Sequence, residues 1–290
     1  MSQKLKVSII MNCHNGAAYL EESLTSILKQ SYKQWELIFF DNKSDDNSKK
    51  IFLSFKDKRL KYFYSSKFIN LYRARNLAIE KSKGQFIAFL DTDDLWVKDK
   101  LEKQIKKMKH DNTNFLYSNY YIKNNNKVIV AFKKKKPEGF ITNKLIGLNF
   151  IGILTVIFKK EILIKHKIKF NNTYNIIGDF DYFVHLSKRI RFSYLHEPLA
   201  IYRVHKKNFS LLNTDLYLKE LTMWQKMNKK KFKKEIFQKF ILNRKYITIK
   251  VHIINRRYKK ALLKFMKYPF SLKKIKLFTM FLWPKKHLTL

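Results

Sequence analysis

Cysteine, proline and glycine are scarce in this chain: among 290 residues there are one cysteine, four prolines and six glycines. The single cysteine, Cys13, excludes an internal disulfide, and the first residues lack the long apolar segment of a signal peptide. The longest weakly polar stretch, residues 145–158, is shorter than the about 20 apolar residues of a membrane-spanning helix and is interrupted by Asn149 and Thr155. We therefore expect a reducing, cytoplasmic setting and no segment that spans a membrane.

Glycine-rich phosphate loops are absent as well. None of the six glycines belongs to a G-x-G-x-x-G turn or to a G-K-[ST] P-loop. This absence separates the chain from dehydrogenases and P-loop enzymes. A bound diphosphate would have to be neutralised chiefly by a metal ion and by basic side chains.

Acidic residues are also few. The chain has 22 Asp and Glu against 62 Lys and Arg, a net charge of +40. From residue 211 onward, 22 basic and 3 acidic residues give +19 in 80 positions, which leaves +21 for the first 210 residues. The C-terminal part is thus more than twice as dense in positive charge. Such a surface favours polyanionic partners: anionic lipid headgroups, lipid-linked diphosphates or nucleic acid.

The whole chain is 46% hydrophobic, which is enough for a real core. Along its first part, short apolar runs alternate with helical patterns. The expected elements, in order, are strand 5–11, helix 17–30, strand 35–40, helix 47–55, strand 60–64, helix 71–82, strand 86–90, helix 97–109, and strands 115–122 and 127–132. This alternation predicts an α/β fold with a mostly parallel sheet flanked by helices.

Polar side chains follow three of the expected strands. His14 and Asn15 come after the first, Asp41 after the second, and Asp91 and Asp93 after the run that ends at residue 90. In an open parallel sheet the ligand crevice lies beyond the carboxyl ends of the strands, so we expect these side chains to converge. Two carboxylates one residue apart can bind one divalent cation, and that cation can hold a diphosphate. The sequence therefore predicts a protein that uses nucleotide-activated substrates.

The C-terminal part has a different pattern. Between Phe232 and Phe265, apolar residues recur three, four or seven positions apart among lysines and arginines, which predicts amphipathic helices with a break at Pro269. We expect one domain in residues 1–210 and a basic helical region in residues 211–290. That region either packs as a cap on the first domain or lies on an anionic membrane. The aromatic residues expected to be exposed there are Tyr268, Phe270, Phe278, Phe281 and Trp283.

Six segments follow one another in a recognisable order: 7–16 (VSIIMNCHNG), 35–48 (WELIFFDNKSDDNS), 74–76 (ARN), 89–94 (FLDTDD), 178–181 (GDFD) and 202–205 (YRVH). Together they resemble the family 2, GT-A type inverting glycosyltransferases of bacterial surface polysaccharide biosynthesis, over roughly the first 210 residues. The resemblance implies a GT-A, Rossmann-like fold. It also implies transfer of a sugar, with inversion, from a nucleotide-diphosphate sugar to a hydroxyl of a glycan or lipid-linked saccharide, with a UDP-sugar favoured as donor.

The resemblance assigns five residues to the donor. Asp41 would recognise the nucleotide base by accepting a hydrogen bond from a uracil-type imide, and Asn15 and Arg75 would belong to the nucleotide pocket. Asp91 would face the ribose or the water shell of the metal ion. Asp93 would bind Mg²⁺ or Mn²⁺ between the two phosphates.

Two further residues are assigned to catalysis and to the diphosphate. Asp179 would be the general base on the acceptor hydroxyl, since a sugar hydroxyl is a weak nucleophile and a carboxylate within hydrogen-bond reach can take its proton. His205 would approach the diphosphate or the metal ion. Gly178 departs from the family pattern, because an acidic residue often stands before the catalytic Asp.

Each assignment has a simpler structural alternative. Asp41 opens a segment rich in Asp, Asn and Ser that is typical of turns and helix caps. Asp179 precedes a helical pattern, where an acidic residue is favoured by the helix dipole alone. His205 could be an ordinary surface residue, and Arg75 could lie on a solvated helix face.

Two other functions compete with the glycosyltransferase prediction. The pI of about 10.1 suits a nucleic-acid-binding protein, but the carboxylates gathered at strand ends would repel a polyanion and no helix-turn-helix, zinc-ligand or RNP-type signature occurs. A transferase of the same fold could instead pass its sugar to a polyprenyl phosphate. We expect no nucleic-acid partner, and a protein bound peripherally at the inner face of the cytoplasmic membrane.

Overall fold

The structure is a computed structural model, and it describes residues 5–282. Its internal contacts divide the chain into two units. One unit contains the residues up to 142 together with 150–204, and the other contains 143–149 together with the residues from 205 onward. The boundary expected from the sequence, at residue 210, falls six residues inside the second unit.

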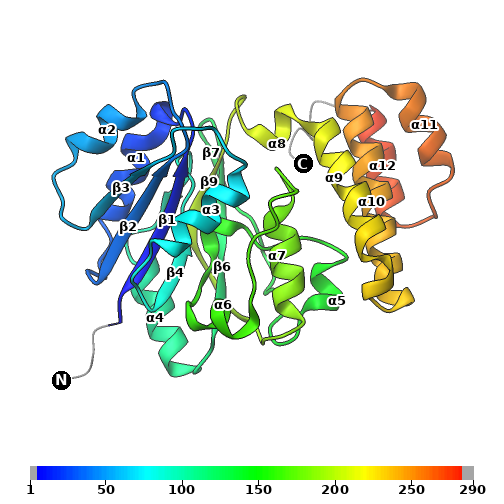
Figure 1. Cartoon of the computed structure of the whole chain (residues 1–290). Coiled ribbons are helices and arrows are strands. Elements are labelled where there is room, and N and C mark those ends of the chain that lie inside the picture. The colour runs from blue at the N-terminus through cyan, green and yellow to red at the C-terminus, as the bar shows by residue number, and fades with distance from the viewer. Residues whose placement is uncertain (1–4, 283–290) are drawn as a thin grey trace. The chain divides into compact units, whose positions relative to one another are not determined.

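In the described part of the chain, nine strands form one sheet in the order β3-β2-β1-β4-β8-β6-β9-β5, with β7 paired to β6 (Figure 1). The strands are β1 Val7–Cys13, β2 Trp35–Asp41, β3 Leu60–Tyr64, β4 Phe86–Phe89, β5 Leu95–Trp96, β6 Phe115–Asn124, β7 Lys127–Val130, β8 Ile157–Lys159 and β9 Ser193–Val204.

The four N-terminal strands are parallel, as the alternating sequence pattern predicts. All seven residues of β1 and all seven of β2 are buried, because helices cover both faces of the sheet at its centre. Beyond β4 the sheet becomes mixed: β8 is antiparallel to β4 and β6, and β9 is parallel to β6 but antiparallel to β5. The sequence analysis did not predict β5, β8 or β9.

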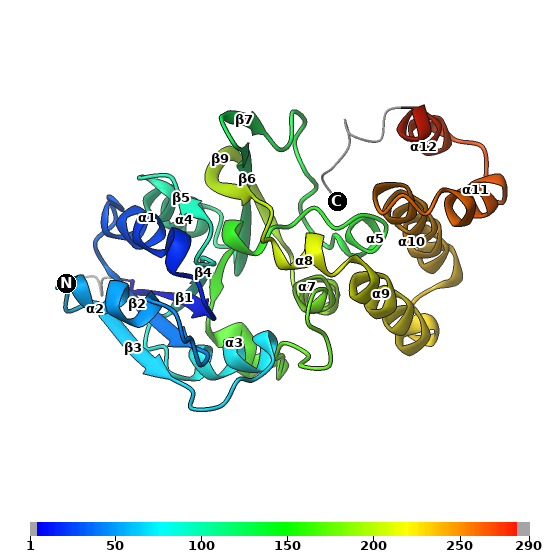
Figure 2. The same ribbon diagram turned by 90° about the horizontal axis from the view of Figure 1, so that it is seen from above.

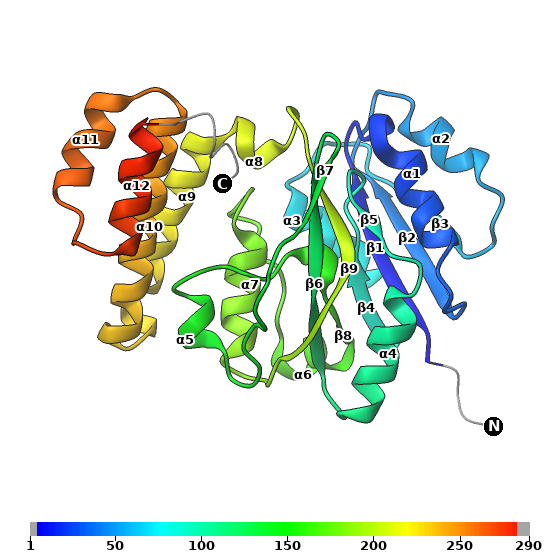
Figure 3. The ribbon, with the colours of Figure 1, turned by 180° about the vertical axis from the view of Figure 1, so that it is seen from behind.

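The helices of the first unit lie on both faces of the sheet, with α1, α2 and α4 on one face and α3, α6 and α7 on the other (Figures 2 and 3). The helical elements up to residue 204 are α1 Ala17–Leu28, α2 Ser48–Ser54, α3 Leu71–Glu80, α4 Lys100–His110, α5 Thr142–Leu145, η1 Ile153–Thr155, α6 Glu161–His166 and α7 Gly178–Ser187. The helix expected at 97–109 begins three residues later, because residues 95–96 form β5.

The second unit is helical, and α10 contacts α9, α11 and α12 within it (Figure 1). Its elements are α8 Phe209–Leu212, α9 Thr214–Asn228, η2 Lys229–Lys231, α10 Lys234–Ile254, α11 Tyr258–Met266 and α12 Leu272–Leu282. Ile249 and Ile253 of α10 form a buried cluster with Ala261, Leu277 and Met280. The described residues of this region are thus helical, and the basic amphipathic character expected for it stays a prediction.

The exposed aromatic residues expected in this unit are only partly found. Phe270 and Phe278 are exposed, whereas Tyr268 is buried in the cluster with Ile249 and Ile253, so its expected exposure is wrong. Phe281 is half-buried against Phe265, and Trp283 lies outside the described residues. None of the helices within residues 5–282 combines the length and apolar character that a bilayer span requires.

Candidate active site

The carboxyl ends of β1, β2 and β4 lie together at one edge of the sheet. β1 pairs in parallel with both neighbours, and Cys13 at its end is in register with Asp41 at the end of β2. Asp91 comes two residues after Phe89, the last residue of β4. Adjacent strands are about 4.8 Å apart, so Asp41 and Asp91, on either side of β1, are on the order of 10 Å apart across this edge.

Asp41 is buried and held by two internal donors. Its Oδ1 accepts the Ser44 backbone N–H at 2.8 Å, and its Oδ2 accepts the Tyr62 hydroxyl at 2.6 Å. Burial and this bond to the carboxylate both raise the pKa of Tyr62, which keeps the phenol a donor. The turn geometry that the simpler alternative requires is thus present. A carboxylate has about four lone-pair sites, so these two donors leave Asp41 able to accept further hydrogen bonds. Recognition of a nucleotide base by Asp41 stays a prediction.

Asn15 connects the loop after β1 to the loop after β2. Its backbone has φ 55°, in the left-handed region that asparagine tolerates. Its Oδ1 accepts the Asp45 N–H at 2.9 Å, and its own N–H donates to the Ser44 hydroxyl at 3.0 Å. Asp46, which the sequence analysis did not single out, accepts the Ala17 N–H at 2.9 Å. The two loops therefore form one hydrogen-bonded rim beside Asp41.

Arg75 is buried on α3 and forms an ion pair with Asp91. Its Nη2 lies 2.8 Å from Asp91 Oδ1, and the side chains are 3% and 35% exposed, respectively. The rings of Tyr72, Phe89 and Phe170 surround the guanidinium, with centroids 5.5–5.7 Å from its central carbon. A solvated helix face is therefore the wrong description of Arg75. The ion pair leaves about a third of the Asp91 side chain accessible.

Asp179 lies in the first turn of α7, within electrostatic reach of Arg75 and Asp91. Its Oδ1 accepts the Phe180 N–H at 2.7 Å. Burial raises the pKa of Asp179 to about 6, Arg75 opposes the rise, and Asp91 adds to it. The carboxylate thus accepts a backbone N–H in the first turn of its helix and also has a pKa suited to taking up a proton near neutral pH. The structure brings together three residues that lie far apart in the sequence.

Gly178 is required by the close approach of α7 to α3. A Cβ at this position would lie 2.4 Å from the aromatic ring of Tyr72. The Tyr72 hydroxyl in turn donates to the Ile176 carbonyl at 2.8 Å. The tyrosine ring therefore occupies the space that a side chain at 178 would need, which gives a physical reason for the departure from the family pattern.

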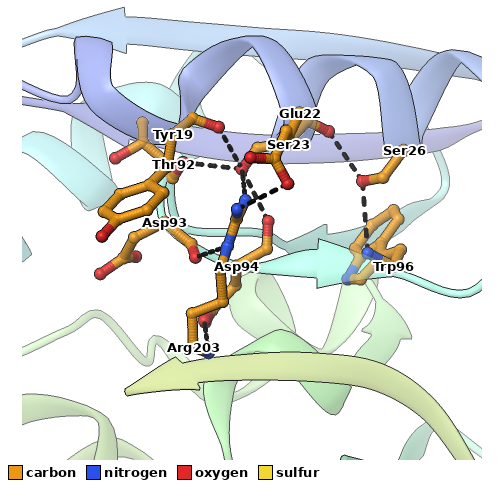
Figure 4. A network of polar contacts seen from close by, with 9 residues as sticks. All are labelled: Tyr19, Glu22, Ser23, Ser26, Thr92, Asp93, Asp94, Trp96 and Arg203. Carbon is orange, nitrogen blue, oxygen red and sulfur yellow. Dashed lines mark hydrogen bonds and ion pairs between the residues drawn. The ribbon is translucent and has the colours of Figure 1, made fainter. Parts of the chain in front are cut away.

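The turn of residues 91–94 is fixed by side chains from α1 and β9 (Figure 4). The Ser23 hydroxyl lies 2.7 Å from the Thr92 carbonyl and 2.6 Å from the Asp94 carbonyl. Arg203 donates from Nε to the Asp93 carbonyl at 2.5 Å and from its backbone N–H to Asp94 Oδ1 at 3.0 Å. The sequence analysis quoted Arg203 as part of a motif but gave it no role.

The carboxylates of this turn repel one another. Burial raises the pKa of Asp91 and of Asp94, and the Asp93 charge adds to both shifts. A divalent cation would relieve this repulsion, and carboxylate oxygens suit Mg²⁺ and Mn²⁺. Within residues 5–282 no group of three or more His, Cys, Asp and Glu side chains could hold a metal ion. An ion held by Asp91 and Asp93 alone would have to take its other ligands from water or phosphate oxygens.

His205 begins the C-terminal segment of the second unit, directly after β9. Its backbone N–H donates to Asn208 Oδ1 at 2.7 Å, and its Nδ1 accepts the Lys207 N–H at 3.2 Å. Its approach to a diphosphate stays a prediction.

Comparisons with known proteins agree with this geometry. The family model described as Glycosyl transferase family 2 matches residues 8–183, which is more than half of the chain. The Escherichia coli protein "UDP-Glc:alpha-D-GlcNAc-diphosphoundecaprenol beta-1,3-glucosyltransferase WfgD" is 41% identical over 157 residues, or 54% of this chain and 61% of the relative. The match thus spans about three fifths of that relative's length.

Two solved structures share the fold at low sequence identity. S. aureus TarS 1–349 in complex with UDP-GlcNAc has a TM-score of 0.65 at 19% identity, covering 82% of this chain and 72% of its own. The mannosyltransferase PcManGT from Pyrobaculum calidifontis, in complex with GDP-Man and Mn²⁺, has a TM-score of 0.63 at 15% identity, covering 98% and 89%. The predicted GT-A fold is confirmed. With the match over residues 8–183, the chain belongs to Glycosyl transferase family 2.

Proposed function

We propose that this chain is a metal-dependent, inverting glycosyltransferase of cell-surface polysaccharide biosynthesis. It would transfer a sugar from a nucleotide-diphosphate sugar to a hydroxyl of a glycan or lipid-linked saccharide. The observation that carries the proposal is the grouping of Arg75, Asp91 and Asp179, in which a carboxylate with a pKa of about 6 lies close to an acidic turn suited to a divalent cation.

The donor side of the proposal uses the edge formed by β1, β2 and β4. A nucleotide with its base near Asp41 and Asn15 could bring its phosphates to Asp91 and Asp93, because these residues follow strands of the same parallel group. The name of WfgD specifies UDP-Glc, and the TarS complex contains UDP-GlcNAc, which supports a UDP-sugar here. His205 is proposed to approach the diphosphate or the metal ion.

Asp93, together with Asp91, is proposed to hold Mg²⁺ or Mn²⁺; the Mn²⁺ in the PcManGT complex supports this assignment. Such an ion, when bound, supplies positive charge where the leaving diphosphate becomes more negative. Arg75 keeps one oxygen of Asp91 in an ion pair, so this carboxylate stays in place whether or not a ligand is present.

Asp179 is proposed to act on the acceptor. Its carboxylate would accept the proton of the acceptor hydroxyl as the oxygen forms a bond to the anomeric carbon of the donor sugar. The bond between that carbon and the phosphate oxygen breaks, and the nucleoside diphosphate leaves with the bonding electron pair. Attack opposite the leaving group inverts the configuration. Proton transfer by a positioned base typically contributes about 10²–10⁴-fold to the rate.

The acceptor side of the proposal involves a lipid surface. The name of WfgD specifies a diphosphoundecaprenol-linked acceptor, and such a lipid places the reaction at a membrane. In the second unit, α11 and α12 bury one face against α10, yet large apolar side chains are also exposed, with Phe270 86% and Leu272 85% accessible. The sequence after Glu235 contains no acidic residue. Exposed apolar groups among lysines suit an anionic bilayer.

We accordingly propose peripheral binding at the inner face of the cytoplasmic membrane. Nucleic acid is not proposed as a partner, since the chain belongs to a glycosyltransferase family and its candidate site gathers carboxylates. A polyprenyl phosphate remains the competing acceptor for the same fold.

Turnover on defined acceptors would test the proposal. The protein would be incubated with a panel of sugar nucleotides and either a diphospholipid-linked GlcNAc or a polyprenyl phosphate, with Mn²⁺ or with EDTA. We expect Mn²⁺-dependent transfer from a UDP-sugar to the saccharide hydroxyl, with the anomeric configuration inverted in the NMR spectrum of the product. Transfer only to polyprenyl phosphate, or transfer that EDTA leaves unchanged, would contradict it.

A further inference from the structure

We infer that Arg203 is a positioning residue that fixes the Asp91–Asp94 turn and thereby aims the carboxylate of Asp93. The inference rests on the proposed function in one respect, the role of Asp93 at the metal ion. Arg203 lies in β9, more than a hundred residues after the turn it holds, and it is 6% exposed.

Three consecutive carbonyls of the turn lie beside two side-chain donors from other elements, and the single hydrogen of the Ser23 hydroxyl can serve only one acceptor at a time. The Thr92 and Asp94 carbonyls flank the Ser23 hydroxyl, and the Asp93 carbonyl between them accepts Arg203 Nε at 2.5 Å. The Asp94 N–H closes the turn on the Asp91 carbonyl at 3.2 Å. Because the peptide planes on both sides of Asp93 are held, the direction of its Cα–Cβ bond is fixed, and this limits the positions that its carboxylate can reach.

The Arg203 guanidinium is engaged on every nitrogen. Besides Nε, its Nη1 donates to Glu22 Oε2 at 2.8 Å and its Nη2 to the Ser23 hydroxyl at 3.4 Å, and the group lies over the Tyr19 ring, 4.8 Å from the centroid. The backbone N–H of the same residue binds Asp94 Oδ1. One residue therefore joins α1, the turn and β9. A lysine has a single ammonium and cannot reproduce this fork of donors.

This geometry supports a role of Arg203 in orienting Asp93, and not in neutralising the charge of its carboxylate. In Figure 4 the Asp93 carbonyl faces the guanidinium, whereas its carboxylate points away from it. Arg203 forms an ion pair with Glu22, whose side chain is 60% exposed. Arg203 therefore acts on a candidate metal ligand through the backbone.

Arg203→Lys is the variant that tests this role, and Arg59→Lys is its matched control. Arg59 also combines an ion pair, to Asp57 at 2.6 Å, with an aromatic contact, 3.7 Å from the Trp35 ring centroid, but it takes no part in the turn. Two quantities would be measured on the full chain: hydrogen exchange of the backbone amides at 94–96 in the protein alone, and the affinity for Mn²⁺ in the presence of UDP by calorimetry. Melting temperatures would report general stability.

Arg203→Lys should exchange faster at residues 94–96 and bind Mn²⁺ about 10–100-fold more weakly, the usual effect of removing a partner that orients a metal ligand. Arg59→Lys should change only the melting temperature. Ser23→Ala is a milder change because it keeps the Arg203 guanidinium. It should also speed the exchange at residues 94–96 and weaken the binding of Mn²⁺. Equal exchange and equal Mn²⁺ affinity in the Arg203 and Arg59 variants would overturn the inference. If the parent protein bound no Mn²⁺, the metal assignment would fall, and the exchange data alone would decide whether Arg203 holds the turn.

Discussion

The ion pair between Arg75 and Asp91, with Nη2 and Oδ1 2.8 Å apart, also acts on the ionisation of a third residue. Arg75 lowers the pKa of Asp179 and Asp91 raises it, while burial of Asp179 is the largest influence and brings the pKa to about 6. Ionisation of Asp179 therefore depends on both partners of the ion pair, and a change in either partner should be measurable in the protonation of Asp179.

The first prediction concerns the pH dependence of turnover. If Asp179 is the general base, it must be ionised to act, so kcat/KM should be constant above a pKa of about 6 and fall about tenfold per pH unit below it. Initial rates with the acceptor well below its KM, between about pH 5 and pH 8, would measure kcat/KM.

Arg75→Met should move that profile to higher pH, because the guanidinium opposes the rise in the pKa of Asp179. Arg73→Met, an exposed arginine on the same helix, is the control and should leave the profile in place. A profile that stays flat well below pH 6 in the parent protein would exclude Asp179 as the base.

The second prediction concerns stability. The pKa of Asp179 is raised in the folded protein from its usual 3.8 to about 6. The ionised carboxylate therefore destabilises the folded protein; this destabilisation is complete above about pH 6 and is absent below 3.8. Asp179→Asn should therefore melt at a higher temperature than the parent near neutral pH, and the difference should shrink as the pH falls through 6.

Asp57→Asn provides a control of opposite sign for the melting experiment. The hydrogen bond from Arg59 lowers the pKa of Asp57, so its carboxylate stabilises the fold at neutral pH and loses this effect in acid. This variant should melt at a lower temperature than the parent near neutral pH. The same sign of change for both variants would show that burial does not control the pKa of Asp179.

The third prediction concerns the contact between α7 and α3. Gly178→Ala should destabilise the fold by about 1–3 kcal/mol, the usual cost of overpacking, because the new Cβ would lie 2.4 Å from the Tyr72 ring. Adding Tyr72→Leu should recover part of the loss caused by the alanine. Urea unfolding of the single and double variants would give the coupling free energy between positions 72 and 178. Additive effects of the two substitutions would refute the proposed steric conflict.

Gly147→Ala is the comparison for this cycle, since its nearest neighbour, the Lys239 side chain, would be 3.4 Å from an added Cβ. Its free energy of unfolding should stay close to that of the parent.

The fourth prediction concerns the membrane surface. Phe270→Ser with Leu272→Ser should weaken binding to phosphatidylglycerol-containing vesicles about tenfold or more, because burial of each side chain contributes about 1.5–3 kcal/mol. Flotation with anionic and with neutral vesicles would measure the bound fraction. Leu53→Ser with Ile164→Ser removes two exposed apolar side chains of the first unit and should have no such effect. Equal binding of the two double variants would argue against insertion of residues 270–272.

The first half of the fold could be predicted from the sequence because its signals are local. Buried strands such as β1 and β2 are continuous apolar runs, and α1 has Leu20, Leu24 and Ile27 at helical spacing. The later strands gave no such signal: β5 has two residues and β8 has three, and both depend on partners distant in the sequence.

The residue types of the candidate site could be predicted from the sequence, but the contacts that hold these residues in place could not. Carboxylates at strand ends identify Asp41, Asp91 and Asp93 without coordinates. No pattern in the sequence shows that Arg203 bonds the Asp93 carbonyl or that Tyr72 fills the space beside Gly178, since these contacts depend on how β9 and α7 pack.

The most direct test separates the proposed metal ligand from the proposed base. Calorimetry would compare the binding of UDP with Mn²⁺ to the parent protein, to Asp93→Ala and to Asp179→Asn, with turnover measured in parallel. We expect Asp93→Ala to lose Mn²⁺-dependent binding, and Asp179→Asn to bind the nucleotide nearly as well as the parent while its turnover is abolished. Unchanged Mn²⁺-dependent affinity in Asp93→Ala, or normal turnover in Asp179→Asn, would contradict the assignment of this site.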